Sequence, residues 1–391
     1  MRVAFTLIGG KEWTGGYNYL LNLLTLLARY QKDAITPVLF VAESVPPDDV
    51  DAFLRIPGVE LVRTPGLNPE RRTRALLRAL ILGRDALMAN LFKAQKVDLV
   101  FEVAQFYGWR LGLPAIAWMT DFQHRAMPQH FSKIAWIKRD LGFRAQVWGA
   151  RFIMLSSNDA RQACEACYPQ SQGRTRTVHF SVEAGSAVDF SQARQVADSY
   201  GLPENFIFMP NQFWRHKNHR LVLNALEILR GRGQHVVIAA TGKQKDLRDA
   251  EYFPALAAEL QAKGLQGSLM LLGLIPYAHL AMLLRASSAF LNPSLFEGWS
   301  TTVEEARTMG VPMILSNLAV HQEQMGAEAV YFDRHSAEAL VAALENFKPM
   351  GLQAREQKSI EARQDATLRV QVFAQAFCRL VVDCHTSYQR V

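Results

Sequence analysis

Residues 289–315, AFLNPSLFEGWSTTVEEARTMGVPMIL, contain the order of elements that decides the fold. The apolar run Ala289–Asn292 predicts a buried strand, and a short loop containing Gly298 follows it. A helix is expected to begin near Ser300–Thr302, because the Ser-Thr-Thr run supplies an N-cap. The next apolar run, Pro312–Leu315, predicts a second strand. A strand, a crossover helix and another strand form the repeating unit of a parallel α/β sheet.

The same alternation extends along the chain in both directions. Helical patterns cover Tyr17–Tyr30 and Arg71–Lys96, each between two β-rich runs. The predicted strands before residue 182 are Val3–Ile8, Pro37–Ala42, Val59–Arg63, Asp98–Val103, Pro114–Met119, Phe152–Ser156 and Thr177–Ser181. The further strands predicted after residue 203 are Phe206–Pro210, Val236–Thr241, Ser268–Leu272 and Val330–Asp333.

A polar stretch divides these two series of strands. It predicts an interdomain linker at residues 183–203, between a domain at 1–182 and a second at 204–358. Residues 359–391 contain a long helical pattern, Ser359–Tyr388, which is expected to cross back to the first domain. A chain of 391 residues also exceeds the usual size of one hydrophobic core. We therefore expect two doubly wound, Rossmann-like α/β domains that face a cleft lined by the carboxyl ends of both sheets.

The composition is that of a folded soluble protein, with 49% hydrophobic and 20% charged residues. No apolar run is long enough to predict a spanning helix. The first residues, MRVAFTLIGG, are typical of a buried strand and not of a secretory signal, which favours the cytoplasm. The net charge of +7 favours an anionic partner, either a phosphorylated ligand or an acidic lipid surface. Nucleic acid ranks last, because the basic residues are scattered without interleaved aromatic residues.

The four cysteines favour ordinary reduced thiols over a redox or metal site. Cys164 and Cys167 form a lone C-x-x-C inside a predicted helix, whereas Cys378 and Cys384 lie far downstream. Zinc needs four ligands at paired spacings, and a thioredoxin-type motif needs a strand directly before it.

Two acidic residues flank the predicted helix start in the deciding segment. Glu297 lies in the loop before the helix and Glu305 lies inside it, eight positions later. Amide groups and the positive end of the helix dipole at this point favour a phosphate. Carboxylates accept hydrogen bonds from hydroxyl pairs, and therefore suit a sugar and a ribose. The alternative is a capping box followed by a solvated helical glutamate.

This segment resembles the E-x7-E signature of retaining GT-B glycosyltransferases, particularly glycosyltransferase family 4. The similarity extends from an N-terminal Gly-Gly turn to about Asp333. It implies that Glu297 faces the transferred sugar and that Glu305 holds the ribose hydroxyls. It also implies that the run from Gly298 to Thr301, which includes Trp299 and Ser300, contacts the diphosphate and the sugar.

A second candidate element is the segment 208–218, FMPNQFWRHKN, which contains Asn211 among the expected donor-binding residues. Lys217 occupies the lysine position of the family, but Gln212 stands where the family has arginine. Arg215 is therefore the expected substitute for that arginine. Two cations near a diphosphate would stabilise its growing charge as it leaves. The alternative is a basic surface loop.

Backbone groups of three glycine-containing turns are expected to contact the donor. Gly15 and Gly16 lie between a strand and a helix, where amides approach a phosphate or sugar closely, although a merely tight turn is the alternative. The resemblance implies that they lie beside the diphosphate and the acceptor. The base is expected to meet backbone groups near two further turns, which contain the residues Thr241, Gly242, Leu274 and Ile275.

Two further segments belong to the N-terminal half. In residues 118–131, WMTDFQHRAMPQHF, Asp121 matches the aspartate of the family's His-Asp pair, while Thr120 replaces its histidine. His124 either fills that vacancy beside the sugar or packs the loop. Residues 70–87, with five arginines among apolar residues, either lie against anionic lipid or an acidic acceptor, or form a solvated helix.

The resemblance implies transfer of a hexose, with retention, from GDP-mannose or a UDP-sugar to a hydroxyl of a glycan or lipid-linked glycan. Bacterial surface polysaccharide synthesis is the expected context, either free in the cytoplasm or peripherally at the inner face of the membrane. No cofactor is expected beyond the nucleotide sugar, which acts as co-substrate. The D-x-D at Asp49–Asp51 predicts a helix start and not a metal site, so catalysis is expected to be metal-independent. A nucleotide-sugar hydrolase or epimerase, and a silent nucleotide-sugar-binding subunit, are the alternatives.

Overall fold

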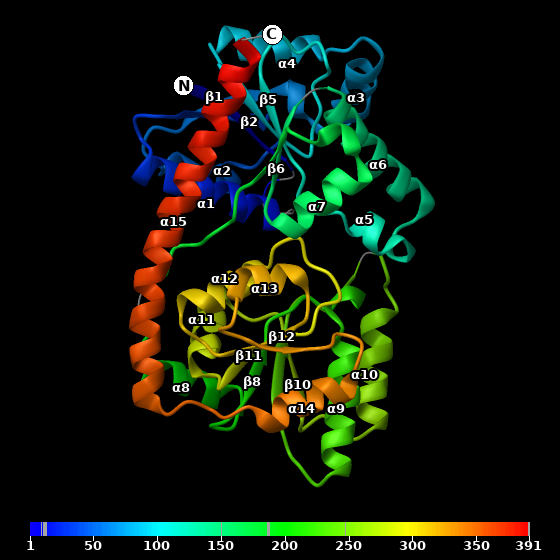
Figure 1. The fold of residues 1–391 in the computed structure, drawn as a ribbon, viewed down its shortest axis with the longest axis vertical. Coiled ribbons are helices and arrows are strands. Elements are labelled where there is room, and N and C mark those ends of the chain that lie inside the picture. Colours follow the sequence, from blue (N-terminus) through cyan, green and yellow to red (C-terminus); the bar gives the residue numbers. More distant parts are fainter. Residues whose placement is uncertain (9, 11–13, 150, 186–187, 247, 390–391) are drawn as a thin grey trace. The chain divides into compact units, whose positions relative to one another are not determined.

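The computed structural model describes residues 1–391 except 9, 11–13, 150, 186–187, 247 and 390–391. The chain forms two compact units. Unit 1 contains Met1–Phe180 and Arg369–Val391, and unit 2 contains Ser181–Leu368. Figure 1 shows each unit as a sheet flanked by helices.

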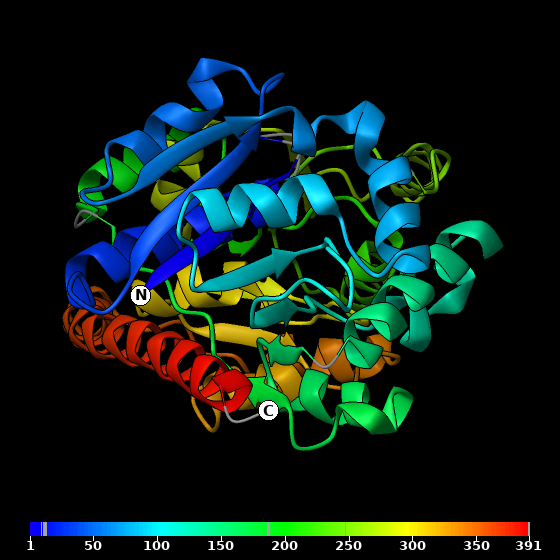
Figure 2. The same ribbon diagram turned by 90° about the horizontal axis from the view of Figure 1, so that it is seen from above.

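The sheet of unit 1 is parallel throughout and has the strand order β3-β2-β1-β4-β5-β6-β7. Its strands are β1 (Arg2–Leu7), β2 (Thr36–Ala42), β3 (Glu60–Thr64), β4 (Leu99–Val103), β5 (Ala115–Trp118), β6 (Phe152–Leu155) and β7 (Thr175–Thr177). The helices between them are α1 (Thr14–Tyr30), α2 (Pro47–Leu54), α3 (Arg72–Ile81), α4 (Ala86–Ala94), α5 (Gln123–Ala126), α6 (Lys133–Trp148) and α7 (Asn158–Cys167). Strands β1 and β2 are almost completely buried, as expected for a sheet covered on both faces (Figure 2).

The sheet of unit 2 is also parallel, in the order β10-β9-β8-β11-β12-β13. Its strands are β8 (Ile207–Met209), β9 (Ile238–Thr241), β10 (Leu269–Gly273), β11 (Ala289–Asn292), β12 (Met313–Ser316) and β13 (Val330–Phe332). Its helices are α8 (Phe190–Ser199), α9 (His219–Gly231), α10 (Tyr252–Ala262), α11 (Tyr277–Ala286), α12 (Thr301–Thr308), α13 (Ala319–Met325) and α14 (Ala337–Asn346).

Successive residues of strand β8 point into two different cores, which is why helices cover both faces of this sheet. Ile207 and Met209 join one cluster with apolar residues of α9, α10 and α14. Phe208, between them, joins a second cluster with residues of α8, α11 and α12. The side-chain period of two in a strand produces this division. The predicted doubly wound α/β class is therefore confirmed in unit 2.

The last helix, α15 (Leu352–Gln389), contributes to both units. In unit 1 the ring of Phe377 packs on Phe5 and Phe101, with centroid distances of 5.9 and 5.3 Å. In unit 2 the guanidinium of Arg355 donates hydrogen bonds to the carbonyl oxygens of Arg285 and Ser287, both 2.6 Å long. The helix begins seven residues before the Ser359–Tyr388 pattern that the sequence predicts.

Every strand predicted from the sequence corresponds to a strand of the structure, and three details differ. The helical pattern over Arg71–Lys96 is divided into α3 and α4, because Gly83 between them has a left-handed φ of 75°. Strand β7 ends at Thr177, where the predicted strand begins. The stretch 183–203 contains α8, whose alanines Ala193 and Ala197 are buried in the second core cluster of unit 2.

Candidate functional site

The strand order of unit 2 reverses between β8 and β11, which lie side by side. In parallel α/β sheets, ligands bind beyond the carboxyl ends of the strands at such a reversal. Asn211 and the 3-10 turn Arg215–Lys217 follow β8, whereas the loop with Glu297 follows β11 and leads into α12. The topology therefore brings together two segments that lie about 80 positions apart in the sequence.

Lys217 and Glu297 meet at this point. The Lys217 Nζ atom donates to Glu297 Oε1 over 2.6 Å, and their side chains are only 13% and 9% exposed. The backbone also joins the two loops, because the Leu295 amide donates to the His216 carbonyl oxygen over 2.8 Å. The predicted cation and the predicted sugar-facing carboxylate thus form a nearly buried ion pair.

Asn292, the last residue of β11, organises the loop that carries Glu297. Its Oδ1 accepts hydrogen bonds from Asn211 Nδ2 (3.3 Å) and Ser294 Oγ (2.6 Å). The Ser294 hydroxyl also lies 2.7 Å from Glu297 Oε1, at donor distance. The Asn292 side-chain amide reaches Ser300 Oγ over 3.2 Å. One buried side chain therefore connects the ends of β8 and β11 with the start of α12.

Ser300 occupies the N-cap position of α12, but its hydroxyl does not cap the helix. The hydroxyl interacts with Asn292 and with Thr302 Oγ1, 3.2 Å away. The side chain of Gln324, from α13, instead binds the Ser300 backbone: its Oε1 accepts from the amide (3.3 Å) and its Nε2 donates to the carbonyl oxygen (3.0 Å). The predicted helix start is correct, whereas the predicted side-chain cap is wrong. Thr301, the first helical residue, is exposed.

The two glutamates of the spacing motif have pKa values displaced in opposite directions. Burial alone would raise the pKa of Glu297, but the charge of Lys217, with help from His321, outweighs it and lowers the value to about 2. Desolvation raises the pKa of Glu305 to about 7, against a small opposing effect of a 3.4 Å hydrogen bond from the Tyr277 hydroxyl. Glu297 is therefore ionised at neutral pH, whereas the pKa of Glu305 lies near neutrality.

Arg215 does not join this ion pair. Its guanidinium forms a salt bridge with Asp249 at 2.5 Å and lies over the ring of Tyr252, 5.4 Å from the centroid. Half of its side chain is exposed. The prediction that Arg215 and Lys217 act together is therefore not supported by their contacts, because Asp249 already compensates the arginine charge.

Three loops of unit 2 carry the residues expected near the base and the diphosphate. Gly242 has a φ of 154°, and a Cβ at this position would lie 2.5 Å from the Asn211 carbonyl oxygen, so the β9 loop approaches the β8 loop at van der Waals distance. The Thr241 hydroxyl donates to the Gly273 carbonyl oxygen over 2.5 Å. Leu274 directly follows β10 and is 78% exposed, and the half-buried Ile275 comes next. Gly298 and Trp299 are half-buried in the loop before α12.

Unit 1 places Gly15, Gly16 and Asp121 at the carboxyl ends of its own strands. Both glycines lie in the first turn of α1, which follows β1, with Gly15 exposed and Gly16 buried. Asp121 follows β5 and accepts hydrogen bonds from the Gln123 amide and from Arg139 Nη2, both at 2.8 Å. The Asp121 side chain therefore bonds to the first residue of α5 and to Arg139 of α6.

His124, which the sequence predicts either to fill the family's histidine position beside the sugar or to pack the loop, is completely buried. Its ring packs against Phe143 and Trp136, and its Nε2 lies 3.4 Å from the Tyr168 hydroxyl. Burial, assisted by the charge of Arg139, lowers the pKa of His124 to about 4. Because no part of the ring reaches solvent, the packing interpretation is the one that the geometry supports.

The remaining sequence features have structural explanations. Asp49 lies in the first turn of α2, two positions after Pro47 at its start. Cys164 and Cys167 are free thiols at the end of α7. Among the described residues, no group of histidine, cysteine or acidic side chains is arranged to hold a metal ion. No described helix is sufficiently long and apolar to span a bilayer.

Sequence reasoning missed Asn292, Gln324, His321 and Tyr277. His321, on α13, is buried, its Nδ1 lies 3.0 Å from the Ser316 carbonyl oxygen, and its charge affects Glu297. Only Asn292 carries a local signal, as a polar residue that ends an apolar run. The others reach the site from other elements, so no spacing in the sequence indicates them.

These features define the class of the fold, two doubly wound parallel sheets with a candidate phosphate and sugar site on the second. Residues 194–365 match the model of the family described as glycosyl transferases group 1. The matched region lies within unit 2 and contains both Lys217 and Glu297. No curated protein sequence matches the chain.

Solved structures with the same fold cover nearly the whole chain. HepE of Anabaena, in complex with UDP and glucose, has a TM-score of 0.68 at 16% identity, over 98% of this chain and 100% of that chain. A glycosyltransferase of Rickettsia africae has a TM-score of 0.70 at 14% identity, over 99% and 97%. Sucrose-phosphate synthase of Thermosynechococcus elongatus has a TM-score of 0.68 at 16% identity, over 99% and 100%. The predicted GT-B fold is thereby confirmed, whereas assignment to family 4 stays a prediction.

Proposed function

We propose that the protein is a retaining glycosyltransferase that uses a nucleotide-diphosphate sugar. The observation that carries this proposal is the 2.6 Å ion pair of Lys217 and Glu297 at the strand-order reversal, directly before the start of α12. Glu305 lies on the same helix, eight positions after Glu297. A cation, a helix N-terminus and two carboxylates suit a diphosphate flanked by a sugar and a ribose. The family match of this unit supports the same function.

In the proposed reaction, Lys217 and the amides at the start of α12 bind the donor diphosphate. The bond between the anomeric carbon and the β-phosphate oxygen breaks, and its electron pair leaves with the nucleoside diphosphate. Preorganised positive charge stabilises this leaving group without further rearrangement. The acceptor hydroxyl oxygen bonds to the anomeric carbon on the face that the diphosphate leaves, and its proton passes to a phosphate oxygen. Configuration is retained, and no metal ion is required.

Glu297, held ionised by Lys217, orients hydroxyls of the transferred sugar, and Glu305 accepts hydrogen bonds from the ribose. Asp121 is proposed to support the acceptor side through α5 and α6. Arg215 and His124 are not included in the reacting group, because the first is paired with Asp249 and the second is buried.

The donor is proposed to be a UDP-hexose or GDP-mannose. UDP is the first nucleotide to test, because the HepE structure contains UDP and glucose. The acceptor is proposed to be a hydroxyl of a glycan or lipid-linked glycan in bacterial surface polysaccharide synthesis, on the cytoplasmic side of the membrane. The net charge of +7 is compatible with these anionic substrates.

A panel of nucleotide sugars, each with and without candidate acceptors, tests the proposal. Release of nucleoside diphosphate that depends on an acceptor supports transfer. Consumption of donor without any acceptor would indicate a hydrolase or epimerase, and binding without turnover would indicate a silent subunit. A prior thermal-shift screen with UDP, GDP and their sugars identifies the donor, because a ligand that binds the folded state raises its melting temperature.

The two carboxylates are expected to have separable effects. Glu305→Ala should mainly weaken nucleotide binding, whereas Glu297→Ala should mainly lower turnover of bound donor. Titration calorimetry with the nucleotide and steady-state kinetics distinguish the two effects. Unchanged binding and kinetics in both variants would contradict the assignment of this site.

A further inference from the structure

Helix α6 of unit 1 exposes an apolar stripe. Ile134, Ile137, Leu141 and Trp148 recur at helical spacing and are 68%, 50%, 53% and 60% exposed. Residues at this spacing lie on one face of a helix. An amphipathic helix of a soluble domain normally turns such a face towards the core, and α6 turns it towards solvent.

Helix α3 continues this surface. The side chain of Ala79 on α3 packs in one small cluster with Phe106 and with Ala145 of α6, so the two helices are neighbours (Figures 1 and 2). Outside this contact α3 exposes apolar side chains of its own, including Leu77 (51%) and Ile81 (76%). Two neighbouring helices thus each expose several large apolar side chains, whereas only single exposed apolar residues are ordinary on a protein surface. We name the exposed side chains of α3 and α6 the α3–α6 face.

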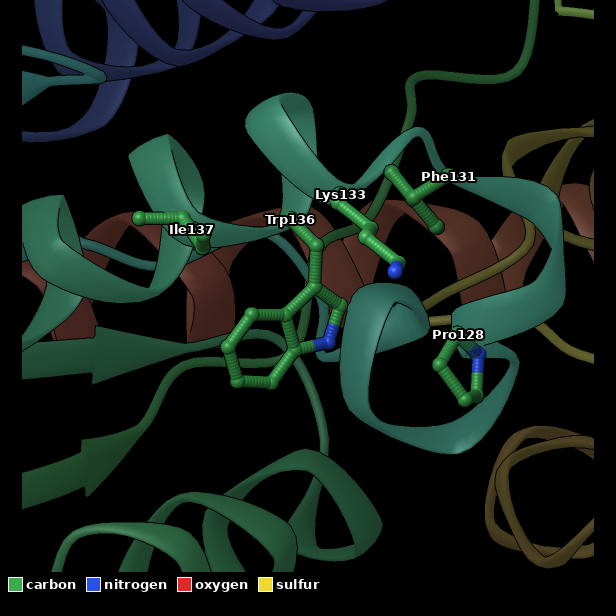
Figure 3. A pocket seen from close by; sticks show the side chains of 5 residues that line it. All are labelled: Pro128, Phe131, Lys133, Trp136 and Ile137. Carbon is green, nitrogen blue, oxygen red and sulfur yellow. The ribbon is translucent and has the colours of Figure 1, made fainter.

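An open apolar pocket lies at the start of α6. Figure 3 shows its lining, which consists of Pro128, Phe131, Lys133, Trp136 and Ile137, around a cavity of about 350 Å³. Apart from the Lys133 amine, the lining side chains are aromatic or aliphatic. Ile137 belongs both to this pocket and to the stripe of α6, so the pocket borders that stripe.

The charge on this face has one sign. Exposed cations of α3 are Arg72, Arg74 and Arg78, and those of α6 include Lys133 and Lys138. The sequences of α3 and α6 contain a single acidic residue, Asp140, which is buried and bonded to Arg125 and Arg144. Protein interfaces are depleted in lysine, whereas basic residues interleaved with large apolar residues are typical of helices that lie on anionic lipid.

We propose that the α3–α6 face docks the protein on the surface of an anionic lipid bilayer. Ile134, Leu141, Leu77 and Ile81 enter the boundary between headgroups and acyl chains, and the arginines and lysines bind lipid phosphates. The pocket beside Lys133 receives the apolar chain of a lipid, and the Lys133 amine contacts the phosphate of the same lipid. This inference does not depend on the proposed function, since it involves neither donor nor acceptor.

Vesicle flotation of the full-length protein, without donor or acceptor, tests the proposal. Vesicles of phosphatidylcholine alone are compared with vesicles containing about 30% phosphatidylglycerol. The protein should float with the anionic vesicles only, and raised salt should release it, because salt screens exposed charges. The double variant Ile134→Gln with Leu141→Gln should lower the bound fraction by about tenfold.

The matched control is Leu368→Gln with Val372→Gln, which removes two similarly exposed apolar side chains (61% and 63%) from α15 and should bind like wild type. A third variant, Arg74→Gln with Arg78→Gln, should bind anionic vesicles more weakly at low salt. Thermal unfolding of every variant verifies that the fold is unaffected. Equal binding to both kinds of vesicle, or equal binding by the α6 variant and wild type, would overturn the proposal. The proposal would also be overturned if the protein did not bind vesicles and sedimentation showed a dimer that the α6 substitutions dissociate.

Discussion

Lys217 and Arg215 lie in one 3-10 turn, two positions apart, but their partners come from different parts of unit 2. Lys217 binds Glu297 in the loop after β11, and Arg215 binds Asp249 before α10. Removing Lys217 leaves a nearly buried carboxylate without its cation and removes the charge proposed to hold the diphosphate. We expect Lys217→Met to lower kcat/KM by about 100-fold or more. Arg215→Met, the matched control, should stay within a few-fold of wild type, and equal losses in the two variants would restore the paired-cation hypothesis.

Glu305 is expected to make stability depend on pH. Its pKa is about 7 in the folded protein against an ordinary value of 4.5, so between these values the folded state binds more protons than the unfolded state. The free energy of unfolding therefore falls as pH rises through this window, and the full decrease is reached above about pH 7. Glu305→Gln should raise the free energy of unfolding at pH 8 by about 1–3 kcal/mol and leave it unchanged at pH 4.

Denaturant unfolding at both pH values measures this effect. Glu328→Gln, which alters an exposed carboxylate of the same unit, is the control and should change neither value. A Glu305→Gln variant that gains no stability at pH 8 would contradict the raised pKa. The same substitution should weaken nucleotide binding. Glu305 would thus lower the stability of the folded protein while it increases the affinity for the nucleotide.

At the scale of elements, the turn between α12 and β12 is held tightly against α15. Gly310 has a left-handed φ of 67°, and a Cβ there would lie 2.6 Å from the Lys358 carbonyl oxygen. We expect Gly310→Ala to destabilise unit 2 by about 2–4 kcal/mol, because it combines an unfavourable φ with a backbone clash. Gly267→Ala, at a glycine with open space around its Cα, is the control. If the urea midpoint shifted equally in both variants, the expected clash would be absent, because α15 would have moved away from residue 310.

The strands and most of the helices could be predicted from the sequence. The central strands, such as β1, β2 and β4, are nearly continuous apolar runs, because helices cover both faces, and such runs are easily recognised. Helix α8 was not recognised, because its sequence, FSQARQVADS, buries only small alanines and otherwise looks like a polar linker. The packing of α8 on α11 and on the core of unit 2 is seen only in the tertiary structure.

At the scale of the whole molecule, the chemistry is expected to proceed without a metal ion. In the proposed site Lys217 and the start of α12 supply the positive charge, and the D-x-D of Asp49 and Asp51 lies in helix α2. We expect a protein stripped with EDTA to keep its transfer activity within about twofold, and added Mg²⁺ or Mn²⁺ to change it little. Loss of activity in EDTA that returns with one of these ions would show that a metal holds the diphosphate instead.

The sequence by itself determined the alternation of strands and helices, the GT-B class and the placement of Glu297 and Glu305 around a helix start. Each of these depends on local pattern, since periodicity and spacing are set by neighbours along the chain. The partners of the charged side chains were decided only by the tertiary structure. Glu297 lies 80 positions from Lys217 and Asp249 lies 34 positions from Arg215, so strand order and not spacing selects between the two cations. His124 is likewise buried only because Phe143 of α6 and Tyr168 enclose it, and nothing adjacent to His124 in the sequence indicates this burial.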